Sequence, residues 1–74
     1  MKHYFLIMTD RSIKYQKICE TYEEAVKEAP NVVDTWWDTV GTCAIHEVDS
    51  NFLIYKVYYF KNGQLTETKV WKED

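Results

Sequence analysis

With 74 residues, of which 46% are hydrophobic and 28% charged, the chain has the size and balance of one soluble globular domain. Two glycines and one proline exclude low-complexity and collagen-like proteins, and a formal net charge of −3 argues against the basic balance that is usual in nucleic-acid-binding domains. The longest apolar run, residues 4–8, is far shorter than the roughly 20 residues of a membrane-spanning helix. Because the N-terminus also lacks the pattern of a signal peptide, we expect a single cytoplasmic domain over residues 1–74, without membrane contact.

The first elements predicted along the chain are two strands joined by a turn. Residues 3–9 are rich in β-forming side chains and apolar on both faces, which is typical of a strand in the interior of a sheet. Asp10 and Ser12 supply turn chemistry, because their side chains can bond nearby backbone amides. Residues 13–19 then alternate between apolar and polar, as in a shorter, half-exposed strand. The N-terminal part therefore predicts a hairpin.

A helix is predicted next, over residues 21–29. Thr21 and Glu24 match the capping box, in which the threonine hydroxyl accepts a hydrogen bond from a backbone amide of the first turn. Pro30 disfavours helical geometry at the residue before it, so we expect the helix to end there. Residues 31–40 are compatible with a strand, but their spacing favours a short helix or helical turn. One apolar stripe at i, i+3, i+4 and i+7 consists of Tyr22, Ala25, Val26 and Ala29.

Three further strands are predicted over residues 43–48, 52–60 and 64–71, with a turn at residues 49–51. Asn62 and Gly63 are the preferred pair of a type I′ hairpin turn, because both tolerate positive φ. The fold class is therefore α+β: a single antiparallel sheet of about five strands, in the order ββα-turn-βββ, with one main helix packed on one face.

The two-residue loop predicts the register of the last hairpin and sorts its side chains into two sets. We expect the uncharged set beneath the helix, and it consists of Leu53, Tyr55, Val57, Tyr59, Thr66, Thr68 and Val70. The other set mixes rings with charges and is expected on the face that the helix leaves open. It consists of Ile54, Lys56, Tyr58, Phe60, Leu65, Glu67, Lys69 and Trp71. Exposed rings on that face suit a protein partner or a second copy of the chain, although lysine stems can also shield such rings on a monomer.

Acidic residues are concentrated in the middle of the chain. Residues 20–49 contain eight acidic residues and one lysine, Lys27. This helical layer can steer towards a basic partner surface, and an ordinary solvated helix face explains the same pattern. Trp36 and Trp37 lie between Asp34 and Asp38, and a ring within a charged rim is typical of binding hot spots. We expect one tryptophan in the core and the other partly exposed. The candidate partner-binding residues are Glu24, Glu28, Asp34, Trp36, Trp37, Asp38, Tyr58, Phe60 and Trp71.

No motif in the sequence indicates catalysis or a bound cofactor. The chain has no P-loop, no dinucleotide-binding glycine motif and no metalloprotease helix motif. Cys43 and His46 are three residues apart on a predicted strand, so they point to opposite faces and cannot exchange a proton. Cys19 and Cys43 are expected as buried thiols rather than a disulfide, and their spacing from the histidines forms no short zinc chelate. We expect no enzyme activity, no metal and no cofactor.

In size and composition the chain is similar to small acidic, aromatic-rich proteins of phages and mobile elements, many of which bind and block a host protein. This likeness rests on no motif and assigns no residue. We predict a non-enzymatic protein-binding module, of the inhibitor or adaptor kind, that acts through an acidic helix face and exposed rings. One alternative is self-association as a homodimer. Another, disfavoured by the acidic pI of about 5.3, is binding of single-stranded nucleic acid by the open sheet face, through Tyr58, Phe60 and Trp71 with Lys14, Lys56 and Lys69.

Overall fold

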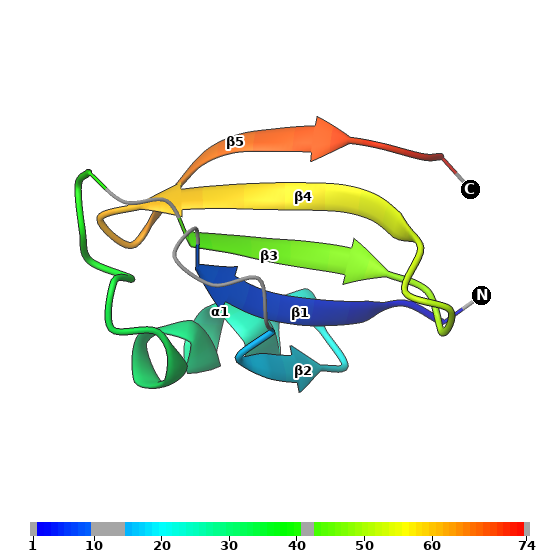
Figure 1. Cartoon of the computed structure of the whole chain (residues 1–74), viewed down its shortest axis with the longest axis horizontal. Helices are drawn as coiled ribbons and strands as arrows, with labels where there is room; N and C mark the ends of the chain where they lie inside the picture. Colours follow the sequence, from blue (N-terminus) through cyan, green and yellow to red (C-terminus); the bar gives the residue numbers. More distant parts are fainter. Residues whose placement is uncertain (1, 10–14, 41–42, 74) are drawn as a thin grey trace.

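Five strands and one helix make up the structure, a computed structural model that describes residues 2–9, 15–40 and 43–73 (Figure 1). The strands lie side by side as a single sheet with the helix on one face, which confirms the predicted α+β class. The predicted turn at residues 10–12 and the start of the second predicted strand lie outside the described residues. In chain order the elements are β1 (Tyr4–Thr9), β2 (Lys17–Cys19), α1 (Tyr22–Val32), β3 (Cys43–Val48), β4 (Ile54–Lys61) and β5 (Gln64–Val70).

The sheet has the strand order β2-β1-β3-β4-β5, and all neighbouring strands are antiparallel. Leu6 and Ile7 point to opposite faces of β1 and both are fully buried, as predicted for an interior strand. One edge strand, β2, has only three residues, whereas the other, β5, is exposed along its whole length. Within the ranges given above, no helix has the length and apolar character needed to cross a membrane.

The helix begins as predicted but continues beyond its predicted end. Thr21 is the N-cap, and its hydroxyl accepts a hydrogen bond of 3.1 Å from the Glu24 N–H. The predicted end before Pro30 is wrong, because α1 runs to Val32 with the proline inside its last turn. A proline removes one intrahelical hydrogen bond. The turn continues nevertheless, since the Val33 N–H donates to the Ala29 carbonyl at 3.0 Å and both side chains are buried.

The segment after α1 forms turns that rest on the last hairpin, in line with the predicted helical turn. Successive hydrogen bonds run from the Trp36 N–H to the Val33 carbonyl and from the Asp38 N–H to the Thr35 carbonyl. The hairpin turn then donates back: the Gly63 N–H bonds the Trp36 carbonyl and the Asn62 N–H bonds the Asp38 carbonyl, both at 2.9 Å. These two bonds fix the segment against the end of β4 and β5.

The predicted register of the last hairpin is correct only next to its turn. Asn62 and Gly63 both have positive φ, of 52° and 72°, as a type I′ turn requires. Beyond the pair of Phe60 and Leu65, a β-bulge places Tyr59 opposite Glu67. The extra residue is Thr66, whose hydroxyl donates to the Tyr59 carbonyl at 3.2 Å. The predicted pairs further along the hairpin are therefore wrong by one residue.

The predicted assignment of the two faces of β4 is inverted. Phe60 pairs with Cys43 and Tyr58 pairs with Ile45, and these residues lie on the side of the sheet that carries α1. The core on that side is completed by residues of β1, β2, α1 and the following turn: Ile7, Cys19, Ala25, Ala29, Val33 and Trp36. Absence of charge along a hairpin does not determine which face is covered. That is decided by the pairing with β3, whose Cys43 and Ile45 face the helix.

Candidate functional site

The face of the sheet opposite α1, called here the open face, has a histidine at its centre. Cross-strand partners share a face, so one row of side chains can be followed over all five strands. The two inner neighbours of His46 in this row are buried, and the two end residues are exposed. From β2 to β5 the row consists of Ile18, Leu6, His46, Val57 and Lys69.

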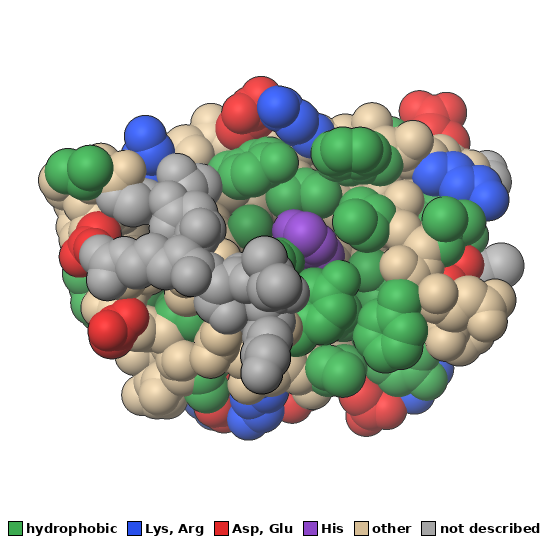
Figure 2. All heavy atoms as spheres, viewed as in Figure 1, with side chains coloured by type: hydrophobic (Ala, Val, Ile, Leu, Met, Phe, Trp, Pro, Cys, Tyr) green, Lys and Arg blue, Asp and Glu red, His purple; other side chains and the backbone are tan. Residues whose placement is uncertain are grey.

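Two stacked rings stand above one part of the open face. Tyr15 and Phe52 have ring centroids 6.3 Å apart and nearly parallel planes, at 10°. Tyr15 also meets the His46 ring edge-on, at 6.1 Å. Figure 2, which looks onto this face, shows a histidine with hydrophobic side chains on several sides. We call Tyr15 and Phe52 the aromatic knob.

Phe52 occupies a backbone conformation that is unusual for a large side chain. It is the third residue of a three-residue loop, closed by a hydrogen bond from its N–H to the Asp49 carbonyl at 3.0 Å, and its φ is 63°. Loops of this type normally carry glycine or asparagine at that position. The loop therefore keeps a strained phenylalanine whose side chain remains 53% exposed.

The strain at Phe52 is held by the Asp49 side chain. One of its carboxylate oxygens accepts from the Asn51 N–H at 2.8 Å and from the Leu53 N–H at 3.1 Å, and the other accepts from the Tyr55 hydroxyl at 3.2 Å. Burial opposes the ionised form, but the hydrogen bonds from Leu53, Asn51 and Tyr55 outweigh it and lower the pKa of Asp49. An ionised Asp49 thus fixes the conformation that displays the Phe52 ring.

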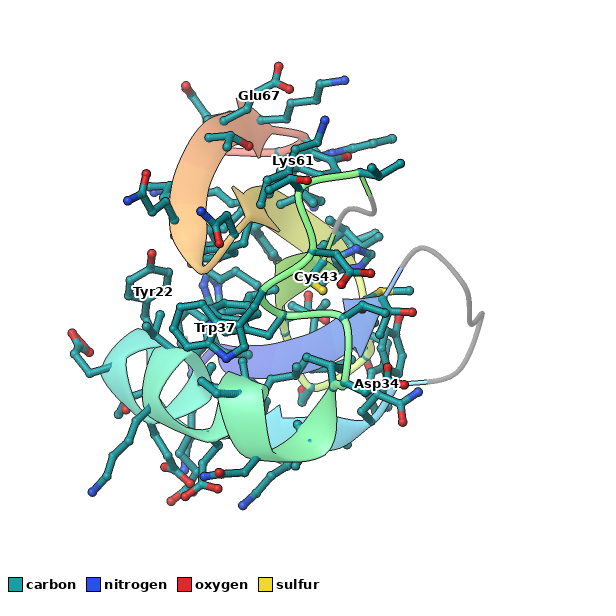
Figure 3. The ribbon with its side chains drawn as sticks, turned by 90° about the vertical axis from the view of Figure 1, so that its left-hand side faces the viewer. Tyr22, Asp34, Trp37, Cys43, Lys61 and Glu67 are labelled. Atoms are coloured by element: carbon teal, nitrogen blue, oxygen red, sulfur yellow. The ribbon has the colours of Figure 1, made fainter. Side chains whose placement is uncertain are left out.

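The other part of the open face contains a hollow of about 450 Å³. Two lysines and one glutamate give its lining a positive balance, and the Lys69 ammonium lies 5.6 Å from the centre of the Tyr59 ring. Lys61 and Glu67 are far from α1, at the β4 and β5 end of the molecule (Figure 3). We call this depression the hollow; it is lined by Met8, Thr9, Ala44, His46, Tyr59, Lys61, Thr66, Glu67 and Lys69.

His46 touches both the aromatic knob and the hollow. Its ring meets Tyr15 and also lines the hollow. Burial lowers the pKa of His46 below its ordinary value, so the imidazole is neutral at pH 7. Its Nδ1 atom is buried and has no hydrogen-bond partner among the described residues. A buried, unsatisfied nitrogen in the middle of an apolar face is costly to the fold.

The predicted ring residues of the site are not brought together. Trp36 and Phe60 are core residues, 2% and 3% exposed, with ring centroids 4.6 Å apart, so neither can contact a partner. Tyr58 is half-buried on the side of α1. Trp37 and Trp71 are exposed but lie in different segments, Trp37 in the turn after α1 and Trp71 directly after β5. The expectation of one core and one exposed tryptophan in the pair is confirmed.

The predicted acidic residues also have mixed surroundings. Glu24 is exposed in the first turn of α1, where its backbone N–H bonds the N-cap, and Asp34 is exposed after the helix. Glu28 pairs with Lys17 of β2 at 3.3 Å, which neutralises part of the acidic helix surface. Asp38 is half-buried, and its carbonyl accepts a hydrogen bond from the last hairpin. The acidic middle of the chain is thus distributed over several environments.

A second polar cluster lies on the side of α1, at the end of the sheet. The Glu47 carboxylate accepts a hydrogen bond from the Tyr58 hydroxyl at 2.7 Å and contacts His3 Nδ1 at 2.6 Å. Burial opposes ionisation of Glu47, but these two hydrogen bonds outweigh it and lower its pKa. Burial, and then the bond to Glu47, raise the pKa of Tyr58. A phenol held in its neutral form by a carboxylate is a support for that carboxylate, and it is poorly suited to act as a nucleophile.

Cys19 and Cys43 are free and buried, as predicted. Among the described residues, no group of three or more histidine, cysteine, aspartate or glutamate side chains is arranged to hold a metal ion. Comparisons with protein-family models, curated proteins and solved structures find no match to this chain.

Four residues of the open face are absent from the predicted partner-binding residues: Tyr15, His46, Phe52 and Tyr59. Tyr59 was expected beneath the helix, and His46 was weighed as a catalytic base beside Cys43 and rejected. A signal for Phe52 was present in the sequence, because the turn residues Asp49, Ser50 and Asn51 are followed directly by a large ring where such loops favour glycine.

Proposed function

We propose that this chain is a small, non-enzymatic protein-binding domain that holds its partner on the open face. The observation that carries this proposal is the Phe52 ring, which is 53% exposed although its backbone has a φ of 63°. Glycine or asparagine at this position would relieve the strain. A ring retained at the expense of stability is typical of a residue that contacts something outside the fold.

The surroundings of Phe52 support a protein as the bound molecule. Ile18 and Tyr15 are exposed beside it, and Leu53 follows it with 46% of its surface exposed. Contiguous apolar surface of this kind on a small domain usually marks an interaction site. Aromatic side chains are also enriched at the centre of protein interfaces, whose rim is polar. The acidic residues of the first turn of α1, Glu23 and Glu24, lie on the other side of the molecule and are not part of this face.

The proposal is tested by comparing two variants of matched exposure. Phe52→Asn removes the Phe52 ring from the aromatic knob and leaves a residue that accepts positive φ. Leu65→Asn removes a side chain that is equally exposed, at 50%, but lies on the side of α1. Immobilised native and variant chains are offered to a lysate of the cells that express the protein, and the bound proteins are quantified by mass spectrometry.

We expect a partner protein that the native chain and Leu65→Asn capture in equal amounts. Phe52→Asn should capture at least about tenfold less of it, as is typical when a hot-spot ring is removed. Equal retention by all three chains would reject the open face as the binding site. Circular dichroism and thermal unfolding of each variant establish that the fold is kept.

Binding of single-stranded nucleic acid remains a second candidate because of one observation, the Lys69 ammonium above the Tyr59 ring on the open face. Three residues first assigned to this function, Tyr58, Phe60 and Lys56, lie on the other side of the sheet. A mobility-shift experiment with single-stranded oligonucleotides at about 50 and 200 mM salt tests it, since phosphate-driven binding falls steeply over that range. Absence of a shift at the lower salt concentration would eliminate this candidate.

A further inference from the structure

We propose that the partner of the open face is a second copy of this chain, and that the aromatic knob of each copy enters the hollow of the other. This inference rests on the proposed function, because it names the molecule that the open face binds. Three properties of the open face support a second copy as the partner: the relative positions of the knob and the hollow, their chemistry, and the area and charge of the surface.

The knob and the hollow lie towards opposite ends of the open face. Phe52 borders a depression that it shares with Tyr4 at the start of β1, whereas the hollow is bordered by Met8 near the end of β1. Four residues of a strand separate these two positions by about 13 Å. His46 lies between them and contacts both. A two-fold axis that passes close to His46, in the plane between two facing sheets, therefore brings each knob over the other copy's hollow.

The chemistry of the two parts is complementary. The knob presents the faces and edges of two rings, and the hollow presents the cations Lys61 and Lys69 beside the Tyr59 ring. Ammonium groups bind the faces of aromatic rings, and rings pack against each other at an offset. A volume of about 450 Å³ is within the range of pockets that enclose small organic groups. Both halves of a self-complementary contact are thus present on one face.

The dimensions and the charge of the molecule are compatible with a dimer interface on the open face. The two longer extents of the molecule are 33 and 22 Å, and their product is about 700 Å². A standard interface buries roughly 800 Å² on each partner. When two open faces meet, the helices that carry Glu23, Glu24 and Glu28 lie on the outer sides, with both sheets between them. The net charge of −3 on each copy therefore opposes this arrangement only weakly.

The oligomeric state is measured by sedimentation equilibrium of the native chain, Phe52→Asn and Leu65→Asn, up to about 0.5 mM, a range that covers micromolar and weaker dimers. We expect a native dimer, a dissociation constant at least about tenfold larger for Phe52→Asn, and no change for Leu65→Asn. A native chain that is monomeric throughout overturns the inference. So does a dimer that Phe52→Asn leaves intact, or one that Leu65→Asn weakens equally.

The arrangement of the dimer is tested with two single-cysteine additions. Ser50 borders the same depression as Phe52, and Lys61 lines the hollow. We expect a short bis-maleimide to cross-link Ser50→Cys chains to Lys61→Cys chains when the two are mixed, and to cross-link neither variant to itself. Cross-linking of either variant alone would overturn the placing of the knob in the hollow. The native thiols, Cys19 and Cys43, are both 1% exposed, and the unmodified chain in the same reaction measures their reactivity.

These outcomes separate the inference from the proposed function. A monomeric chain that still captures another protein through Phe52 overturns the dimer and supports the binding domain. A dimer of the expected arrangement with no other captured protein supports both, because the second copy is then the partner. A monomer that captures nothing in a Phe52-dependent way overturns both.

Discussion

Replacing Gly63 with alanine is expected to destabilise the fold by about 3 kcal/mol, through two separate effects. Gly63 has a φ of 72°, where a Cβ atom costs about 1 kcal/mol. That atom would also lie 2.2 Å from Cζ3 and 2.7 Å from Cε3 of Trp37, so the indole has to leave the turn. Trp37 is 62% exposed, and the buried remainder of its side chain, on the order of 100 Å², stabilises the fold by about 2 kcal/mol. For a domain of this size the sum corresponds to a fall in Tm on the order of 15 °C.

A double-mutant cycle with Trp37→Ala separates the two effects. In the Trp37→Ala background only the backbone strain remains, so Gly63→Ala should cost about 1 kcal/mol there. Chemical denaturation followed by circular dichroism gives all four free energies of unfolding. Asn62→Gly, which changes the same turn without adding a Cβ atom, serves as the control for turn formation. If Gly63→Ala costs the same with and without Trp37, to within about 0.5 kcal/mol, then the indole does not rest on the turn and the reasoning is refuted.

Three further predictions concern the open face, the helix and the buried carboxylate. The pKa of His46 is lowered in the fold, so the unfolded chain takes up the proton first, and the stability of the fold should decrease as the pH drops below about 6.5. The denaturation midpoint should therefore change less between pH 7.5 and pH 5.5 for His46→Leu than for the native chain. An equal change in both chains would contradict the assignment. Thr21→Ala should destabilise the fold by about 1 kcal/mol and Thr21→Ser by much less, because serine keeps the hydroxyl that accepts the hydrogen bond from the Glu24 N–H. Equal losses of stability in the two variants, measured by chemical denaturation, would mean that the cap is not formed. Tyr58→Phe should destabilise the fold by about 2 kcal/mol, because the Glu47 carboxylate loses the hydrogen bond that the Tyr58 hydroxyl donates. The same change should raise the pKa of Glu47 in an NMR titration. An unchanged Glu47 pKa would show that this hydrogen bond is absent.

Local sequence patterns predicted the elements of this fold because the chemistry that forms them is local. Thr21 caps a helix through an amide three residues away, and Asn62 and Gly63 both accept the positive φ of their turn. The end of the helix was wrong because it depends on distant contacts. Val33 is buried against the sheet, and this burial carries the helix past Pro30.

The faces of β4 were not predictable from the last hairpin alone. Within a hairpin, alternation separates two faces but does not say which one the helix covers. The bulge at Thr66 shifts the register on β5, and a second irregularity between Glu47 and Val48 shifts the register of β3 against β4, so that Glu47 faces Lys56 and Val48 faces Ile54. Both changes come from the fit between neighbouring strands, which a single strand's pattern does not contain.

The candidate surface was missed for a different physical reason. Propensity and periodicity identify residues that favour the local structure in which they lie. Phe52 is instead a residue that its loop position, with positive φ, disfavours. A ring at a loop position that favours glycine weakens the fold slightly and adds little to the core. The Asp49 carboxylate nevertheless secures that loop with two backbone hydrogen bonds, so the conformation is fixed and the ring is presented in one orientation. A strained position that is also held rigidly makes sense when the exposed side chain has to fit another surface. Phe52→Asn should therefore leave the free energy of unfolding within about 1 kcal/mol of the native value, since relief of strain offsets the lost ring contacts, while it abolishes binding by the open face. A variant that loses several kcal/mol of stability would instead identify Phe52 as a core residue, and the strain would then carry no functional meaning.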